Sequence, residues 1–446
     1  MDRRGFLHRA GALSLGLMGL RNAVNLAPGR GSGYGPLIAD PQGVLDLPAG
    51  FTYQLISQVG QTMTDGLMVP DRFDGMCAFD GPDNTVLLVR NHELVETSSN
   101  GPFGPNNPLY SQINPSMLYD KGLNTTPSLG GTTTIQFDPA TGTVLQQFMS
   151  LAGTLRNCGG GPTPWGTWIS CEETTQTSGP WHEQDHGFCF EVPASANGQL
   201  NAAVPLQAMG RFQREAIAID PMHGHIYMTE DRPDSLIYRF IPNVPGQLAH
   251  GGALQALVVL GYPSLDTTNH AGTSIPVGTR FKTIWTDLRN PMAPLDDLRI
   301  RGAAAGAAVF TRGEGMWAGE QDIFFACTNG GASHRGQIWR YRSDPAEHQD
   351  QGPTGKLELF LEPNNPSIME NVDAITVSPW GHLFCCEDGP GDDHVVGVCP
   401  NGMTYRFARN AADLTEFSGA TFSPDGSTLF VSYYRPGRTF AINGPW

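Results

Sequence analysis

A strand–turn–strand unit recurs six times along this chain of 446 residues, and the repeat constrains the fold more than any other feature. The first strand of each unit begins at residues 74, 158, 215, 314, 373 and 419 with DGMCAF, CGGGPTPW, EAIAID, EGMWAG, DAITVS and GATFSP. A second apolar strand follows a tight turn and reads VLLVRNHE, TWISCEE, HIYMTEDR, DIFFACTN, HLFCCED and TLFVSYYR. Short runs of β-branched, aromatic and apolar residues between Pro, Gly and Asp turns are typical of antiparallel hairpins.

Repeats with several strands each predict a β-propeller, in which about 40 to 50 residues form one blade. Most units here start further apart than that. We therefore expect an all-β fold, a six-bladed β-propeller with long inserted loops and an N-terminal signal segment. The last residues, TFAINGPW, are expected to close the final blade with the N-terminal segment, because closure removes an exposed sheet edge.

Five of the six units begin with a residue that can bind a metal, namely Asp74, Cys158, Glu215, Glu314 and Asp373. The innermost strands of a propeller surround one channel, so equivalent strand ends converge on one mouth. Carboxylates and a thiolate buried together are very unfavourable unless cations neutralise them. The set predicts a multinuclear metal site. For a single acid the alternative is a bond to turn amides, which acidic residues often make in loops.

Further acids end the second strands at the equivalent position, and Glu230, Glu387 and Asp388 are predicted to be outer ligands or supports together with Asp74 and Asp373. His92 lies between Asn91 and Glu93, and alternation along an extended segment turns it away from both of them. We therefore expect His92 to support the site without binding metal.

Cys158 differs from the other seven cysteines because three glycines follow it and leave room for a ligand to approach. A thiolate in such a place is a candidate ligand for iron or another thiophilic metal, and a disulfide is the alternative. Cys77, Cys171, Cys327, Cys385 and Cys386 lie in apolar strands and are expected to be small buried hydrophobes. Cys189 and Cys399 could each pair with another thiol.

The N-terminal residues combine Arg3 and Arg4 with a short, weakly apolar stretch at residues 10–20, the pattern of a twin-arginine export signal. The alternative is a chance pair of arginines before a frayed helix. We expect residues 1–34 to be the signal peptide and linker, residues 35–446 to be a single propeller catalytic domain, and the protein to be periplasmic or extracellular. A net charge of −16 argues against nucleic-acid binding.

The segment NCGGGPTPWGTWISCEET at residues 157–174 resembles the signature of the PhoX-type alkaline phosphatases. RNHE before this segment, and REAIAIDP, RGEGMW and SPDGSTLFVS after it, occur in the order typical of that family. The resemblance covers nearly the whole chain after the signal. It implies a six-bladed propeller that is exported by the twin-arginine machinery and hydrolyses phosphate monoesters with an iron and calcium cluster.

The resemblance also implies roles for single residues. Cys158, Glu215 and Glu314 would bind iron, expected as Fe3+, and Arg312 would face the substrate phosphate. The calcium ligands would be Asn91, Glu93, Glu172 and Glu173. We expect a monomer whose partners are phosphate monoesters and the export machinery. A planar arginine fork suits two phosphate oxygens, although Arg312 could instead pair with a surface acid.

Two other functions fit the repeat. One is a calcium-stabilised propeller that binds a partner and catalyses nothing, and the other is a metal-dependent propeller lactonase or ester hydrolase. Cys158 distinguishes them from the phosphatase, because a site that holds only calcium has no use for a soft thiolate.

Overall fold

The computed structural model describes residues 33–124, 127–345 and 355–446. The predicted export signal lies outside the described residues and stays a prediction. Within the described part of the chain, no helix has the length and apolar character needed to cross a membrane.

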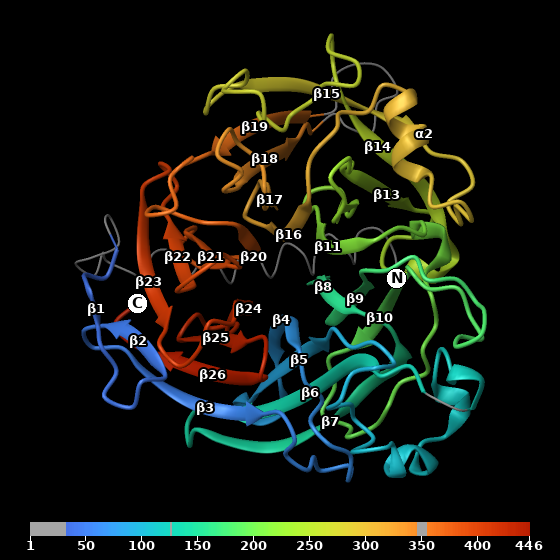
Figure 1. The fold of residues 1–446 in the computed structure, drawn as a ribbon, viewed down its shortest axis with the longest axis vertical. Coiled ribbons are helices and arrows are strands. Elements are labelled where there is room, and N and C mark those ends of the chain that lie inside the picture. The colour runs from blue at the N-terminus through green and yellow to red at the C-terminus, as the bar shows by residue number, and fades with distance from the viewer. Residues whose placement is uncertain (1–32, 125–126, 346–354) are drawn as a thin grey trace.

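The described residues form an all-β, propeller-like arrangement of sheets around a central axis (Figure 1). A four-stranded sheet contains β4 (Phe73–Asp80), β5 (Val86–His92), β6 (Gly130–Asp138) and β7 (Thr143–Thr154). The next sheet contains β8 (Asn157–Pro162), β9 (Thr167–Glu172) and β10 (Cys189–Pro193).

A nine-stranded sheet follows, in the order β11 (Arg214–Ile219), β12 (Ile226–Glu230), β13 (Tyr238–Pro242), β14 (Gly252–Val259), β15 (Arg280–Asp287), β19 (Gly355–Leu361), β18 (Gln337–Ser343), β17 (Ile323–Cys327) and β16 (Gly313–Ala318). A six-stranded sheet has the order β1 (Leu37–Ile38), β2 (Leu45–Pro48), β23 (Thr404–Asn410), β22 (His394–Val398), β21 (Leu383–Glu387) and β20 (Val372–Val377). The last sheet is β24 (Phe417–Phe422), β25 (Thr428–Tyr433), β26 (Arg438–Asn443) and β3 (Thr52–Gln58).

Helical structure is sparse in the described residues. The one α-helix among them is α2 (Leu298–Ala304), in the insertion between β15 and β16. Single 3-10 turns occur at η1 (Pro82–Asn84), η2 (Pro108–Gln112), η3 (Pro115–Met117), η4 (Gly122–Asn124), η5 (Gln207–Met209) and η6 (Leu248–His250). Three of these turns lie in the long connection between β5 and β6, so this loop is one of the expected insertions.

The structure corrects the expected number of separate blade sheets. Six were predicted, but the described strands form five hydrogen-bonded sheets. The reason is β15, which pairs with β14 on one side and with β19 on the other, with Lys282 opposite Lys356. This outer strand joins two meanders, β11 to β14 and β16 to β19, that are separate in the sequence repeat.

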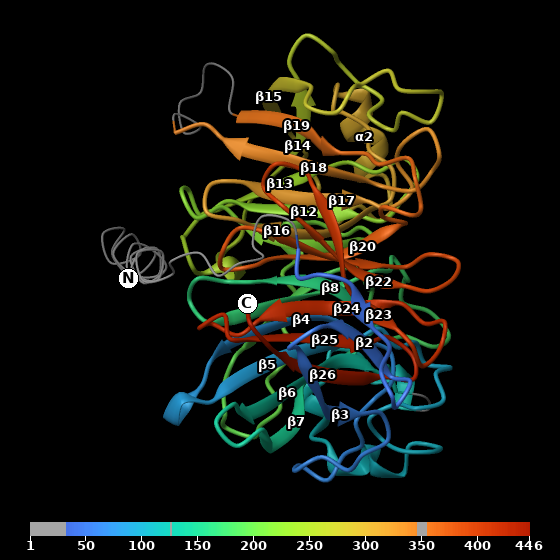
Figure 2. The ribbon, with the colours of Figure 1, turned by 90° about the vertical axis from the view of Figure 1, so that its left-hand side faces the viewer.

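Six strands nevertheless surround the centre, one for each sequence unit. They are β4, β8, β11, β16, β20 and β24, and each contacts the next around a closed circuit (Figure 1). In the perpendicular view the sheets lie stacked across the molecule (Figure 2). The ring places the beginnings of all six units at one end of a common axis.

The N-terminal segment closes the ring, as the sequence predicted. β3 pairs antiparallel with β26, and Leu55 lies opposite Phe440. β2 pairs with β23 of the neighbouring sheet, where Leu45 lies opposite Asn410. The segment from β1 to β3 therefore supplies the outermost strands of two adjacent sheets and joins these sheets to each other.

The hydrophobic core lies between neighbouring sheets. Trp168 and Trp339 are both fully buried, the first between the sheets of β4 and β8 and the second within the nine-stranded sheet. The five cysteines predicted to be buried hydrophobes are all at most 5% exposed. All eight cysteines are free thiols, and Cys189 Sγ lies 3.6 Å from Cys171 Sγ on the adjacent strand.

Candidate metal centre

A β-bulge occurs at the same place in every inner strand. Pairing between the first and second strands shifts register across residues 74–75, 158–159, 215–216, 314–315, 373–374 and 419–420. A bulge leaves the extra residue unpaired and redirects its side chain. Each candidate ligand that begins a sequence unit therefore lies at a bulge on the channel.

A small residue follows every ligand position because the inner strands come into close contact there. A Cβ atom on Gly159 would lie 2.6 Å from the backbone oxygen of Glu215 and 2.7 Å from its Oε1 atom. At Gly419, whose φ is +59°, a Cβ atom would lie 2.4 Å from the backbone oxygen of Asp74. Even an added methyl group at Gly159 or Gly419 would therefore overlap the backbone of the neighbouring inner strand.

The bulges bring the candidate ligands into overlapping groups of three. One group is Asp74, Glu93 and Cys158, in which the three ligand atoms lie within 4.8 Å of one another. Cys158 also belongs to a group with Glu173 and Glu215. Glu215 in turn groups with Glu314 and Asp373, so seven predicted residues form one continuous chain of donors.

Alternation along the second strands decides which of their acids face this ring. The residue directly after each strand points to the mouth. Arg156 pairs with two such residues, Glu93 at 2.8 Å and Glu173 at 2.5 Å. Asp231 and Asp388 occupy the same position, and both interact electrostatically with Arg312.

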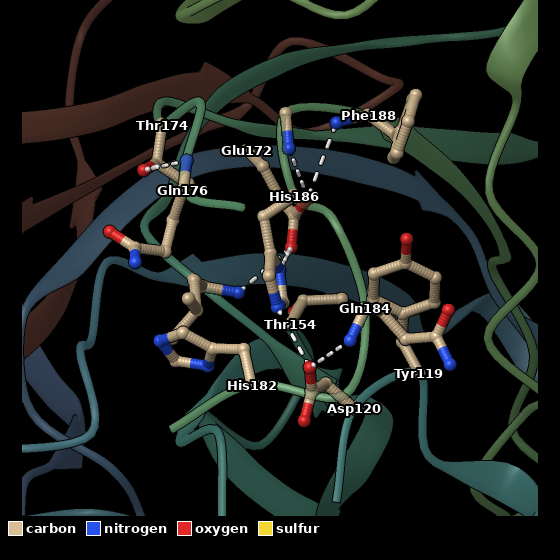
Figure 3. Close-up of polar contacts among 12 residues, drawn as sticks. Tyr119, Asp120, Thr154, Glu172, Thr174, Gln176, His182, Gln184, His186 and Phe188 are labelled. Atoms are coloured by element: carbon tan, nitrogen blue, oxygen red, sulfur yellow. Dashed lines mark hydrogen bonds and ion pairs between the residues drawn. The ribbon is translucent and has the colours of Figure 1, made fainter. Parts of the chain in front are cut away.

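The last residue of each second strand points away from the mouth, into its own sheet. Glu172 is fully buried, and its carboxylate accepts hydrogen bonds from His186 Nδ1 at 2.6 Å and from the backbone N–H groups of Leu155, Gly187 and Phe188 (Figure 3). The other His186 nitrogen lies 3.3 Å from Asp120 (Figure 3). The structure therefore places Glu172 in a satisfied hydrogen-bond network outside the ring.

Glu230 and Glu387 are oriented in the same way. Tyr238 donates a hydrogen bond to Glu230 at 2.7 Å, and Glu387 accepts from the backbone N–H groups of Glu370 and His394. His92 is buried and contacts Thr133 and the backbone oxygen of Asp71, so it supports the site from outside as predicted.

The side-chain amide of Asn91 holds the bulge of β8 in place. Its Nδ2 atom donates to the backbone oxygens of Cys158 and Gly159 at 2.7 and 2.6 Å. Its Oδ1 atom accepts from Trp168 and Ser170. Both ends of the amide are engaged, and the contact with Cys158 fixes the bulge that carries the thiol. The predicted calcium role of Asn91 stays a prediction.

Arg312 lies at the mouth and is held rigidly. Its guanidinium donates two hydrogen bonds to Asp231, at 2.7 and 2.9 Å, and one to Glu314 at 2.9 Å. Among the described residues its Nη1 atom makes no hydrogen bond, and the side chain is 41% exposed. A guanidinium that is fixed by Asp231 and Glu314, with one nitrogen making no hydrogen bond among the described residues, is suited to bind an anion.

The carboxyl groups of the ring are electrostatically strained. Burial and the neighbouring Glu93 carboxylate raise the pKa of Glu173 to about 8, and burial together with Asp388 raises the pKa of Asp373 to about 7. Burial and the Asp74 carboxylate raise the pKa of the Cys158 thiol well above its usual range. Burial also raises the pKa of Glu215 and Glu314, with like charges adding to the effect.

These residues fit a set of bound cations. Glu215 Oε2 is buried and has no hydrogen-bond partner among the described residues, which is costly for a carboxylate oxygen without a ligand. The donor set of carboxylate oxygens and one thiol suits both hard and thiophilic ions. The three arginines at the mouth, Arg72, Arg156 and Arg312, cannot neutralise so many acids, so the site is suited to additional positive charge.

Sequence reasoning missed four residues at this mouth. Arg72 and Arg156 stand two residues before Asp74 and Cys158, the same spacing that separates Arg312 from Glu314, and this repeat could have revealed them. Tyr434 donates a hydrogen bond to Glu93, and burial together with the Asp373 carboxylate raises the pKa of Glu416. Neither residue has a distinctive sequence signal.

The fold and the site together define a propeller-like protein whose channel mouth is built to hold several cations. The family model described as "Alkaline phosphatase PhoX" matches residues 32–437, and the chain belongs to this family. The protein is therefore a metal-dependent phosphatase, a phosphoric monoester hydrolase, and the resemblance in the sequence is confirmed. This excludes the non-catalytic propeller and the lactonase as the main function.

Comparison with solved structures agrees on the fold. The chain is similar to Pseudomonas fluorescens PhoX in complex with vanadate, a transition-state analogue, with a TM-score of 0.67 and 19% identity over 92% of this chain and 97% of that chain. A gluconolactonase from Xanthomonas campestris aligns over 92% of this chain and 98% of that chain, at 10% identity and a TM-score of 0.39. A search of curated protein sequences found no match.

Proposed function

We propose that this phosphatase is a six-bladed propeller that uses an iron and calcium cluster held by the ring. The nine-stranded sheet is counted as two blades, because β11 and β16 each begin a meander. The single observation that carries the proposal is the unbroken series of donors from Asp74 through Cys158 and Glu215 to Asp373.

The type of donor atom determines which ion each group of ligands is assigned to. Cys158 supplies the one sulfur, so iron, as Fe3+, is assigned to Cys158, Glu215 and Glu314. Glu93 and Glu173 supply hard oxygens suited to calcium, with Asp74, Asp373 and Asp388 beside them. Glu172 and Asn91 are assigned positioning roles, because their polar atoms are engaged within the protein.

Hydrolysis of a phosphate monoester requires neutralisation of the phosphoryl oxygens and stabilisation of the leaving group. The bound ions supply that charge and Lewis acidity. Arg312 binds a phosphoryl oxygen through its free Nη1 nitrogen. Asp231 prevents the fork from turning, because two parallel hydrogen bonds fix its plane.

The test is elemental analysis of the purified protein combined with hydrolysis of a chromogenic phosphate ester at alkaline pH, with and without chelator. We expect iron and calcium in the protein and loss of turnover on chelation. Calcium without iron would contradict the iron assignment, and unchanged turnover in chelator would contradict the cluster.

Substitution of ring residues locates the chemistry. Cys158→Ala and Glu314→Gln should each lower kcat by at least about a hundredfold, as expected when an electrostatic contact is lost, while the β-rich circular dichroism is retained. Cys399→Ala is the matched control, because this buried thiol lies outside the ring and should leave iron content and kcat unchanged. Retained turnover in both ring variants would place the reaction elsewhere.

We also propose that the protein is exported as a folded monomer by the twin-arginine route to the periplasm or beyond. This rests on Arg3, Arg4 and the apolar stretch that follows. Replacement of both arginines by lysine should retain the protein in the cytoplasm in a fractionation assay.

A further inference from the structure

A polar cavity of about 150 Å³ lies beside the ring, and the phosphatase reaction described above does not use it. Its walls come from the end of the loop before β4, the start of the long connection after β5 and the turn between β25 and β26. Two arginines, Arg72 and Arg435, line it together with the single carboxylate of Asp71. Thr97 and Ser98 add hydroxyl groups.

The cavity carries excess positive charge. The Asp71 carboxylate is already engaged with the backbone N–H of Gly437 at 2.9 Å and with Asn100 at 3.3 Å. Arg435 approaches it only to 3.9 Å, and its side chain is 59% exposed. Within the described residues the Arg435 guanidinium makes no hydrogen bond, so its N–H groups are available to a ligand.

Arg72 connects the cavity to the metal centre. Its Nη1 atom donates to the Tyr434 hydroxyl at 2.9 Å, and that hydroxyl donates to the Glu93 carboxylate. The backbone N–H of Glu93 also donates to the backbone oxygen of Arg72 at 3.1 Å. Tyr434 therefore links Arg72, which lines the cavity, to the Glu93 carboxylate of the metal centre.

We propose that this cavity is a leaving-group subsite that selects phosphate monoesters carrying a second anionic group. The inference rests on the proposed function, because it places the phosphoryl group of the substrate at the ring. The leaving group then extends past Glu93 toward Arg435, where a carboxylate or second phosphate accepts charge-assisted hydrogen bonds. The hydroxyls of Thr97 and Ser98 suit the polar atoms between the two anionic groups.

The probe is a matched pair of substrates, 3-phosphoglycerate and glycerol 3-phosphate, which differ by a carboxylate in place of a hydroxymethyl group. The measured quantity is the ratio of their kcat/KM values in the metal-loaded protein. Arg435→Gln removes the charge with little loss of length, and Arg435→Lys restores the charge without the fork. Arg280→Gln is the control, since Arg280 is 65% exposed on β15 and removes the same surface charge.

We expect the unmodified protein to prefer 3-phosphoglycerate and Arg435→Gln to lower that preference by about tenfold, chiefly through KM, as for one lost charge-assisted contact. Arg435→Lys should recover part of the preference, and Arg280→Gln should leave it unchanged. Equal losses on both substrates, or an unchanged ratio, would overturn the subsite. No turnover of glycerol 3-phosphate by the unmodified protein would instead contradict the proposed function.

Discussion

At the residue scale, the direction of single side chains separates the metal centre from its supports. Glu172 and Glu173 are adjacent and were predicted to be equivalent, but Glu173 joins Arg156 at the mouth and Glu172 binds His186 inside the sheet. Alternation along an extended strand explains the difference. The same rule predicted correctly that the His92 side chain points away from the metal centre, so it could also have distinguished Glu172 from Glu173.

His186 gives a prediction about pH and stability. Burial alone lowers the pKa of His186, but the carboxylates of Glu172 and Asp120 outweigh burial and raise the pKa to about 9. An unfolded histidine titrates near pH 6.5. The protonated ring therefore stabilises the fold fully below about pH 6.5, and this contribution, on the order of 2 to 4 kcal/mol, is lost as the pH rises through about 9.

Unfolding by denaturant at pH 6 and pH 10 measures this effect. In His186→Gln the fall in the free energy of unfolding between the two values should be smaller than in the unmodified protein. His250→Gln, a change at an exposed histidine, should keep the original dependence. An identical pH dependence in all three proteins would show that the His186 ion pairs do not persist.

At the scale of elements, the bulge in each inner strand is the device that makes the site. The sequence shows a ligand followed by Gly or Ala, but it does not show that this small residue faces the next strand. Gly159 lies against Glu215, a residue 56 positions later in the chain, so the need for a glycine at position 159 comes from contact with a neighbouring sheet. The bulge itself has no local sequence signal other than a ligand followed directly by Gly or Ala.

Gly159→Ala tests the bulge. The added methyl group would overlap the backbone and carboxylate oxygens of Glu215, so we expect a loss of about 1 to 3 kcal/mol in stability and reduced metal content. Thermal unfolding and elemental analysis measure the two effects. Gly179→Ala is the control, because its nearest atom is 3.9 Å away. Full stability and metal content in Gly159→Ala would show that the strands can separate at no cost.

At the scale of the whole molecule, closure of the ring links the metal centre to both ends of the described chain. β3 and β26 meet across about 380 residues of sequence, and Phe440 packs in their shared core at 1% exposure. Because every inner strand contributes to one ring, opening one sheet should disturb the whole ligand set.

Phe440→Ala should therefore lower the free energy of unfolding by about 3 to 5 kcal/mol, as for other buried phenylalanines. We expect loss of bound metal and loss of β structure in a single transition on heating. Phe281→Ala, at a partly buried position in the outer strand β15, should cost less and leave the metal in place until global unfolding. Release of the metal well before unfolding in Phe440→Ala would contradict the coupling between ring closure and the metal centre.

The sequence by itself determined the all-β class, the six recurring strand pairs, the candidate ligands that begin them and the family. These features depend on local alternation and on residue identity, which a linear chain displays directly. Only the tertiary structure decided that β15 joins two meanders, that Glu172 faces away from the ring, and that Arg72 and Arg435 share a cavity. Each of these depends on which distant segments become neighbours, and that is determined by packing around a closed ring.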